Sequence, residues 1–297
     1  MKFTASEDDA GKRLDVFALE YMPQLSRSSV RKLVDDGKVL VNDETAKASY
    51  KIRGADHIEV TYDIGAAGEV PDIELPILYE DNDCMVINKP IGVLTHSKGA
   101  FNPEATIASF LQQKVTFPAA EEPEDEATDT NAREGIVHRL DRATSGVIIC
   151  AKTPEALKHL QKQFNDRKAH KTYVAVIEGA LEPEHAIIDL PIERNPKKPQ
   201  TFRVGPQGKE SQTTYKVLET NGQHSLVELK PKTGRTHQLR VHLHYLKHPI
   251  VGDTFYDGAA HDRLLLHAYQ LEITLPNKER KTFTAEIPDE FRAILDQ

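Results

Sequence analysis

The stretch HRLDRATSG, at residues 138–146, lies between two short apolar runs, 135–137 and 147–151. Both runs have the length and the content of β-branched residues that predict buried strands. The stretch itself places one carboxylate, Asp141, between Arg139 and Arg142. Charged groups next to a core are costly, so this loop indicates side chains that are positioned for chemistry. A charge cluster that only fastens a turn is the alternative interpretation.

The composition is that of an ordinary globular protein. Of the 297 residues, 39% are hydrophobic and 28% are charged, which fits one large domain or a small and a medium one. No apolar run approaches the roughly 18 to 20 residues that span a bilayer, and the first residues lack the apolar core of a secretory signal. Cys84 and Cys150 lie in apolar runs, so we expect buried free thiols. We therefore expect a cytoplasmic protein with no membrane partner.

The acidic residues are unevenly distributed along the chain. The net charge of −8 argues by itself against a nucleic-acid partner. However, residues 63–136 hold 15 acidic and 4 basic side chains, whereas residues 137–297 hold 20 acidic and 24 basic ones. Residues 119–134 are strongly acidic and contain no large apolar side chain, which predicts a mobile acidic insertion. A basic surface elsewhere is therefore compatible with the net charge.

Residues 11–62 have the pattern of a compact α/β module. Apolar side chains recur at helical spacing in a helix that Pro23 would end, namely Leu14, Phe17, Ala18 and Tyr21. Ser26 or Ser28 can cap a second helix, and its inward side chains would be Val30, Leu33 and Val34. Strands are predicted at 38–41 and 57–60. Two short helices and a small sheet follow from this pattern.

The second of these helices has a basic face. Arg27 and Arg31 are four residues apart, and Lys32 lies beside them. Such a face suits a phosphate backbone, although a merely solvated face explains the charges equally well. Three motifs in this order resemble the S4 RNA-binding domain: GKRLD at 11–15, PQLSRS at 23–28 and GKVLVN at 37–42. The resemblance implies an S4 domain over residues 1–62 whose RNA-facing residues are Arg13, Arg27, Arg31 and Lys32.

The remaining chain predicts an α+β fold. Residues 63–75 are rich in small residues and contain Pro71, which is typical of a linker. Thr153 and Pro154 can start a helix with an inward stripe of Leu157, Leu160 and Phe164. Runs at 77–79 and 84–87 predict a β-hairpin, and further strands are expected at 172–177, 187–188, 213–218, 225–229 and 271–275. Because helices are few and strands are many, we expect a mixed, largely antiparallel sheet.

Three kinds of reactive site fit the sequence poorly. Four histidines crowd one segment without the spacing of a helical zinc motif, namely His237, His242, His244 and His248. There Leu239, Leu243 and Leu246 form an apolar stripe that leaves Arg240, His244 and Lys247 on a polar side. Ser145 lacks the flanking glycines of a nucleophile elbow, and the segment 233–236 lacks the lysine of a phosphate-binding loop. We therefore predict no metal site.

The fourth kind of site makes Asp141 the reacting group. A carboxylate can act as a nucleophile or as a base, provided that it stays ionised. A nearby arginine would favour the ionised form, and the candidates are Arg139, Arg142 and Arg235. A nucleobase would also need a flat apolar partner, and Tyr173 follows a basic run that could hold phosphates.

Nearly the whole chain resembles the RluA-type pseudouridine synthases. Beyond the stretch at 138–146, the resemblance rests on blocks in family order: NKPIG at 88–92, KTY at 171–173, TGRTHQLRVH at 233–242, GD at 252–253 and LHA at 266–268. It implies a catalytic domain over residues 76–297 in which Asp141 is the essential aspartate. Arg139 would take the place of the target nucleotide in the stack, Tyr173 would pack against the flipped uracil, and Arg235 would pair with Asp141.

The same resemblance implies the reaction and its substrate. Uridine would be isomerised to pseudouridine, with one C–N bond broken and one C–C bond formed, and with no metal or organic cofactor. The substrate would be large-subunit (23S) ribosomal RNA, with transfer RNA as an alternative, and no obligate protein partner is implied. Two other functions compete. A non-catalytic RNA-binding or ribosome-assembly protein would need the basic surfaces but not Asp141. A glycosidase-like hydrolase would need a second carboxylate, for which the neighbourhood of Asp141 offers no candidate.

Overall fold

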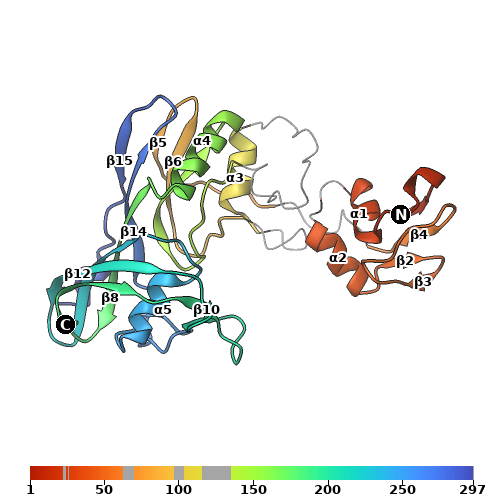
Figure 1. Ribbon diagram of the computed structural model, residues 1–297. Coiled ribbons are helices and arrows are strands. Elements are labelled where there is room, and N and C mark those ends of the chain that lie inside the picture. The colour runs from red at the N-terminus through yellow and green to blue at the C-terminus, as the bar shows by residue number, and fades with distance from the viewer. Residues whose placement is uncertain (23–24, 26, 63–69, 97–103, 116–134, 297) are drawn as a thin grey trace. The chain divides into compact units, whose positions relative to one another are not determined.

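The computed structural model describes residues 1–296 apart from 23–24, 26, 63–69, 97–103 and 116–134 (Figure 1). The chain divides into two compact units, Met1–Ile73 with His96–Ala105 and Glu74–Thr95 with Thr106–Gln297. The acidic insertion predicted at 119–134 lies outside the described residues, as does most of the linker predicted at 63–75. The described part of that linker, residues 70–75, has no regular secondary structure.

The first unit is a small four-stranded sheet with two helices. The strand order is β1-β4-β2-β3, with every neighbouring pair antiparallel. The strands are β1 (Lys2–Thr4), β2 (Val39–Val41), β3 (Glu44–Thr45) and β4 (His57–Val60), and the helices are α1 (Leu14–Glu20) and α2 (Arg27–Asp35), after a 3-10 turn at Glu7–Asp9. The predicted helices are present, whereas β1 was not predicted from its three residues.

The core of this unit contains the predicted apolar stripes with one exception. Leu14, Phe17 and Ala18 of α1 are buried, as are Val30, Leu33 and Val34 of α2. Tyr21 is 41% exposed, because α1 ends at Glu20 and Tyr21 lies past its last turn. Its ring stacks on Phe3 of β1, with centroids 4.2 Å apart. Tyr21 therefore shares the helical spacing of Leu14, Phe17 and Ala18 in the sequence but not their burial.

The second unit is built on a nine-stranded mixed sheet. The strand order is β5-β6-β7-β14-β8-β13-β12-β9, and β15 pairs with β14. Only the pair β7–β14 is parallel among the described strands. The strands are β5 (Ile77–Glu80), β6 (Cys84–Lys89), β7 (Ser145–Ala151), β8 (His170–Glu178), β9 (His185–Asp189), β12 (Gln212–Thr220), β13 (His224–Pro231), β14 (Leu266–Thr274) and β15 (Arg280–Thr284). The α+β prediction and the largely antiparallel sheet are confirmed.

Four helices and a separate hairpin complete the described part of this unit. The helices are α3 (Ile107–Lys114), α4 (Pro154–Asn165), α5 (Gln238–Tyr245) and α6 (Glu290–Ala293), and the hairpin strands are β10 (Ile192–Arg194) and β11 (Phe202–Val204). Helix α4 begins as predicted, since the Thr153 hydroxyl accepts a hydrogen bond from the Ala156 N–H and Pro154 occupies the first turn. Leu157 and Leu160 of α4 are buried. Fully burying one such side chain contributes roughly 1.5–3 kcal/mol.

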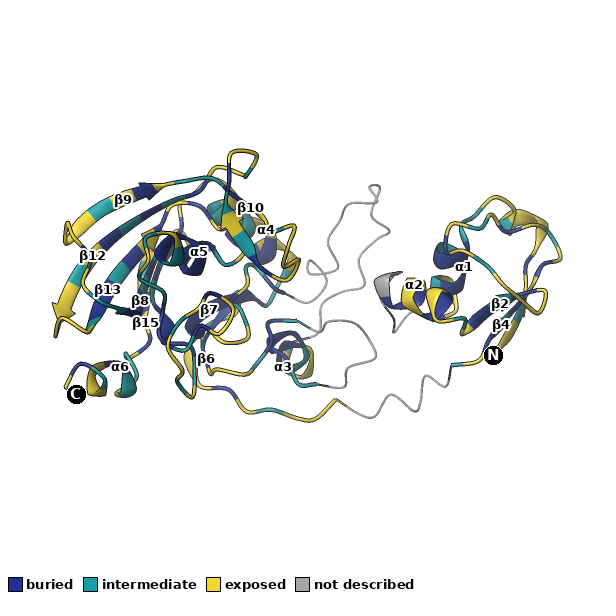
Figure 2. Cartoon of the chain, turned by 90° about the horizontal axis from the view of Figure 1, so that it is seen from below, coloured by how far each residue is buried: buried dark blue, intermediate teal, exposed yellow. Residues whose placement is uncertain are grey.

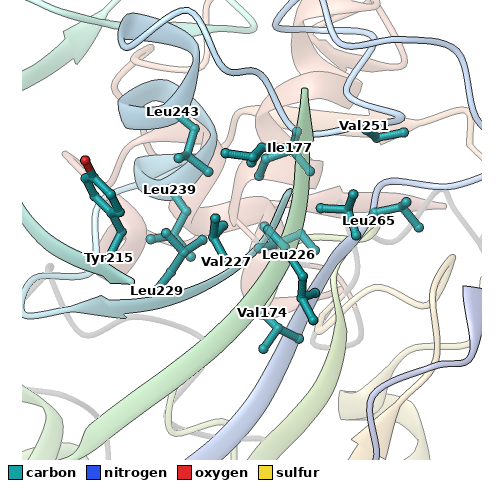
Figure 3. Packing of buried hydrophobic residues seen from close by; sticks show 14 of the residues in the cluster. Val174, Ile177, Tyr215, Leu226, Val227, Leu229, Leu239, Leu243, Val251 and Leu265 are labelled. Atoms are coloured by element: carbon teal, nitrogen blue, oxygen red, sulfur yellow. The ribbon is translucent and has the colours of Figure 1, made fainter. Parts of the chain in front are cut away.

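A second apolar cluster fixes α5 against the sheet. Figure 3 shows Leu239 and Leu243 of α5 packed close to Ile177, Val227 and Leu229 of strands β8 and β13. Burial decreases across the sheet: the inner strand β7 is buried along its whole length, whereas β12 becomes exposed toward its end (Figure 2). On the other side of α5, Val241 packs with Ile192 of β10 and with Tyr256, so the helix is fixed on two sides.

The loop of residues 138–144 enters the sheet through a close contact. Gly146 lies opposite Ala268 in the parallel pair β7–β14, and its φ of 111° favours glycine. A Cβ atom at this position would lie 2.2 Å from the Ala268 carbonyl oxygen. Only glycine fits here, so the glycine at the end of the loop is required by the sheet.

One of the two strands predicted around this loop is absent. Residues 147–151 belong to β7, whereas residues 135–137 form only a single bridge between Ile136 and Cys150. Gly135 has a positive φ of 74°, and the chain leaves the edge of β7 directly after Ile136 to form the loop. The prediction of a strand at 135–137 is therefore wrong.

Candidate functional site

Asp141 lies in a loop that is held on both sides by hydrogen bonds. Before it, the buried Thr95 hydroxyl donates to the Leu140 carbonyl at 2.9 Å and accepts from the Leu140 N–H at 3.2 Å. After it, the Thr144 N–H donates to the Asp141 carbonyl at 3.0 Å. The side chain of Asp141 is 27% exposed. Its backbone is thus fixed while its carboxylate stays accessible.

A fully buried lysine braces the same loop. Lys89, at the end of β6, has no exposed surface. Its Nζ donates to the carbonyls of Pro90 and Val93 at 2.9 Å each and to that of Arg142 at 3.3 Å. Burial lowers the pKa of Lys89 to about 8, against the opposing effect of the Asp141 charge. Lys89 belongs to the motif at 88–92, but no role was predicted for it.

The cation that faces Asp141 is Arg240 on α5. Its Nη1 lies 3.8 Å from Asp141 Oδ2, while its Nε and Nη2 donate to Asp253 at 2.7 Å each. Burial is the largest effect and lowers the pKa of Arg240, but the hydrogen bonds to Asp253 together with the charges of Asp253 and Asp141 outweigh it and raise that pKa. Arg240 is only 7% exposed, so the polar side of the helix on which it was predicted is buried at this residue. The apolar stripe could not reveal that Asp253 supplies a buried partner.

His237 is the second group near Asp141. Its Nε2 lies 3.8 Å from Asp141 Oδ2, and its Nδ1 shares a 2.8 Å hydrogen bond with the Tyr256 hydroxyl. That hydroxyl oxygen already accepts from the Phe202 N–H, so its proton is available to Nδ1. Burial and the charge of Arg240 lower the pKa of His237. We infer a neutral ring whose Nε2–H points toward Asp141.

The backbone at His237 is held in an unusual conformation. Its φ of 56° lies in the left-handed region, which is costly for a side chain with a Cβ and occurs mainly where surrounding contacts impose it. Gln238 provides such contacts, because its Oε1 accepts from the Thr233 hydroxyl at 2.7 Å and from the Arg235 N–H at 3.0 Å. Its Nε2 donates to the Gln212 carbonyl and to Thr213. The segment 233–238 is therefore fixed by one buried amide.

Arg235 does not make the ion pair that was expected of it. Its Nε donates to the Glu210 carbonyl at 3.1 Å, and the ion pairs of Asp141 within the described residues involve His237 and Arg240. The predicted pairing of Arg235 with Asp141 is thus corrected to Arg240. Both arginines belong to the motif at 233–242, and the sequence offered no signal to choose between them because the turn into α5 decides which one faces Asp141.

These groups line one cavity of about 540 Å³. Tyr173 of β8 lines it, and burial together with the Asp141 charge raises the pKa of its hydroxyl. Arg139 lines it as well and is exposed. Among the lining residues Asp141 is the only carboxylate, whereas six are permanently or usually cationic: Arg139, Arg167, Lys171, Lys232, Arg235 and Arg240. In a chain of net charge −8, this cavity has the charge expected of a site for a polyanion.

His138 forms part of the cavity wall. Its ring stacks on Phe164 of α4 with centroids 4.4 Å apart, and its Nε2 accepts a hydrogen bond from the Ile149 N–H. Burial lowers the pKa of His138 to about 3, so the ring is neutral. A neutral ring packed in this way orients the loop and carries no charge toward the cavity.

The residues expected to face RNA in the first unit differ in their surroundings. Arg31 and Lys32 of α2 are exposed, and Arg31 makes only a 3.9 Å contact with Asp35. Arg13 instead donates to the buried Asp15 through two hydrogen bonds of 2.9 and 3.0 Å. The side chain of Arg27 lies outside the described residues. Of the cations on α2 whose side chains are described, Arg31 and Lys32 are both exposed.

The described part of the chain contains no group of three His, Cys, Asp or Glu residues that could hold a metal ion. His242 is buried between Thr213 and the Leu190 carbonyl, and His248 bonds to the Glu178 carbonyl. Cys84 and Cys150 are buried free thiols, as expected. None of the described helices is both long and apolar enough to cross a membrane.

Known proteins resemble this chain over most of its length. The model of the RNA pseudouridylate synthase family matches residues 83–245, and the S4 domain model matches residues 12–58. An uncharacterized RNA pseudouridine synthase of Chlorobaculum parvum is 35% identical, over 100% of this chain and 97% of that protein. Ribosomal large subunit pseudouridine synthase D of Xanthomonas campestris is 34% identical, over 96% and 88%. The structure of human RNA pseudouridylate synthase domain containing 1 matches with a TM-score of 0.59, 31% identity and coverage of 76% and 89%.

Proposed function

The chain belongs to the RNA pseudouridylate synthase family and carries an S4 domain, so it is an isomerase that acts on RNA, and we propose that it modifies uridines of large-subunit ribosomal RNA with Asp141 as the essential carboxylate. The ribosomal target is supported by relatives such as the Xanthomonas campestris protein, which is a ribosomal large subunit pseudouridine synthase by name. Membership of this family argues against the two alternative functions, a non-catalytic RNA-binding protein and a glycosidase-like hydrolase.

The surroundings of Asp141 carry this proposal. It is the one carboxylate among the residues that line the cationic cavity. Its side-chain contacts within the described residues, to His237 and Arg240, are 3.8 Å long and exceed hydrogen-bond length. Neither contact occupies a carboxylate oxygen with a short hydrogen bond, which suits a reacting group.

The other cavity residues suit a flipped uridine. Moving a base out of the stack costs a few kcal/mol, and a stack on an aromatic ring contributes about 1–3 kcal/mol. We assign that stack to Tyr173, whose ring lines the cavity beside Asp141. Arg139 is exposed two residues before Asp141, where it can fill the space that the uridine leaves. Arg235 lines the same cavity, and we assign it to the RNA rather than to Asp141.

The S4 domain would hold the RNA outside the cavity. The exposed Arg31 and Lys32 of α2 suit phosphate contacts. Arg27, one turn before Arg31, would extend that face. Arg13 instead donates two hydrogen bonds to Asp15, and we assign it to the stability of the domain.

Replacing Asp141 tests the assignment. Asp141→Asn keeps the shape of the side chain and removes its charge, so we expect normal folding and RNA binding with no product. Pseudouridines would be mapped in the large-subunit ribosomal RNA of a deletion strain that carries the wild-type gene, the Asp141→Asn gene or an Asp262→Asn gene. Asp262 is exposed and does not line the cavity, so its variant should restore every site. Pseudouridine formed by Asp141→Asn at the wild-type rate would refute the role of Asp141.

A further inference from the structure

Lys171 is a cavity cation to which neither the reaction nor the fold gives an evident use. It lies two residues before Tyr173 on β8, and side chains two apart in a strand point to the same face. Both residues line the cavity. Lys171 therefore lies beside the ring that we assign to the flipped base.

Among the described residues, no carboxylate forms an ion pair with Lys171, although Asp141 lines the same cavity. Its Nζ lies 3.4 Å from the Thr233 carbonyl oxygen, which is the one contact recorded for it within the described residues. Charged groups that are withdrawn from water are normally paired, and burial alone lowers the pKa of Lys171 to about 8. An amine kept in this state costs stability, so a ligand that neutralises it would offset the cost.

The space next to the Lys171 amine is kept open by Gly234. This glycine has an ordinary φ, so its backbone conformation does not require glycine. A Cβ built on it would lie 3.7 Å from Lys171 Nζ, which is the one described heavy atom beyond the adjacent residues within 4 Å of that Cβ. Gly234 is exposed. A side chain at this position would stand in the approach to the amine, whereas glycine leaves it open.

The charged groups around Lys171 favour an anion. The cavity that Lys171 lines is also lined by one carboxylate, Asp141, by five cations and by two histidines, namely Arg139, Arg167, Lys232, Arg235, Arg240, His138 and His237. His138 is neutral, and Glu210 is an exposed residue whose carboxylate lies 3.8 Å from Arg167 and whose carbonyl accepts from Arg235. We propose that Lys171 is a binding residue for a single backbone phosphate of the RNA, adjacent to the uridine held at Tyr173. This inference rests on the proposed function and names the group that anchors the substrate.

Binding measurements across salt and pH test the phosphate contact. The probe is an unmodified transcript of the large-subunit ribosomal RNA. It is bound to the full chain as wild type and as the variants Lys171→Met, Lys171→Arg and Lys158→Met. The last variant is the matched control, because Lys158 is an exposed residue of α4 that does not line the cavity. Lys171→Met should bind at least about tenfold more weakly at pH 7. The slope of log affinity against log salt should become shallower by about 0.7–0.9, the value for one phosphate.

The charge-retaining variant separates a phosphate contact from a structural role. Above pH 8 the free wild-type amine loses its proton, so the affinity of the wild type should fall as the pH rises from 8 to 9. Lys171→Arg stays charged and should show no such fall, with a salt slope like that of the wild type. The same fall in Lys171→Arg, or an unchanged slope in Lys171→Met, would overturn the phosphate contact. If Lys171→Met fails to fold, the pH profile of Lys171→Arg decides alone.

The outcomes also separate this inference from the proposed function. Pseudouridine formed on the transcript by the wild type, together with an unchanged salt slope in Lys171→Met, would leave the function standing and remove the phosphate site. A contact from Lys171 to a uracil carbonyl would lower the affinity of Lys171→Met without changing the slope, and would also overturn the proposal. Absence of pseudouridine with the wild type would instead count against the ribosomal target.

Discussion

Asp253 holds Arg240 through two 2.7 Å hydrogen bonds to Nε and Nη2, which leaves Nη1 directed at Asp141 from 3.8 Å. The guanidinium is thus neutralised by one carboxylate and exerts its field on another. Asp141 keeps a cation nearby without a bond that would have to break during the reaction. Asp253 is a positioning residue in this arrangement, because it acts on the substrate site only through Arg240.

Removing the charge of Asp253 should therefore damage both stability and activity. Asp253→Asn leaves a buried guanidinium without its anion, and breaking a buried ion pair costs about 3–5 kcal/mol. We expect a loss of that order in the free energy of unfolding, measured by urea denaturation, and at least a tenfold lower rate of pseudouridine formation by the folded fraction. Asp257→Asn is the matched control, since Asp257 is 77% exposed, and it should change neither quantity measurably. Equal stability of the two variants would contradict this account.

The ring of Tyr173 should matter more than its hydroxyl. Burial and the Asp141 charge raise the pKa of the Tyr173 hydroxyl, so at neutral pH the phenolate is not available as a base. Tyr173→Phe should keep the rate within about threefold of the wild type, whereas Tyr173→Ala should lower it roughly 5- to 150-fold, the equivalent of a 1–3 kcal/mol stack. Single-turnover rates on a ribosomal RNA transcript would measure this. Equal loss in both variants would instead assign the chemistry to the hydroxyl.

The buried Lys89 should give the protein a distinctive pH dependence of stability. Its pKa falls from 10.5 to about 8 on folding, so between these values the unfolded chain binds the extra proton and stability rises with pH. The stability advantage of the wild type over Lys89→Met should grow by about 2 kcal/mol from pH 7 to pH 9.5. Urea denaturation at several pH values would measure the difference. Lys158→Met, at an exposed position, should show a constant difference, and a constant difference for Lys89→Met would refute the burial of a charged amine.

The glycine that closes the Asp141 loop should not tolerate a methyl group. In Gly146→Ala the Cβ would meet the Ala268 carbonyl at 2.2 Å in a backbone conformation that disfavours alanine. Strain of this kind costs about 1–3 kcal/mol before the collision is counted, so we expect a loss above about 3 kcal/mol in urea denaturation. Gly222→Ala is matched in conformation, with a φ of 86° and no atom within 4 Å of its Cβ. It should lose only about 1 kcal/mol, and similar losses would show that the collision is relieved.

Local patterns predicted the elements that their own residues determine. The stripe of Leu157 and Leu160 and the cap at Thr153 are contained within one helix, so periodicity and capping rules suffice for α4. The short strand β1 depends on pairing with β4 across more than fifty residues, and its three residues carry no such signal. The run 135–137 has the composition of a strand, but the chain leaves the sheet after one bridge.

The site shows the same limit. The motifs brought Asp141, Tyr173 and Arg139 to attention as residue types, and all three line one cavity. The choice of Arg240 over Arg235 depends on Asp253, and the brace formed by Lys89 depends on the Arg142 carbonyl fifty-three residues away. Such relationships arise from tertiary packing and are invisible to spacing along the chain.

The parallel pairing of β7 with β14 imposes an order on the making of the protein. Strand β7, which follows the Asp141 loop, can pair with β6 as soon as it is made, but it gains its second neighbour, β14, only when residues near Ala268 have been synthesised. The sheet of the S4 domain is complete once Val60 has emerged, and domains generally fold as units during synthesis. A growing chain therefore acquires its RNA-docking module first and its reactive cleft last. Premature termination before Leu266 would yield a chain with the docking module but without an assembled site.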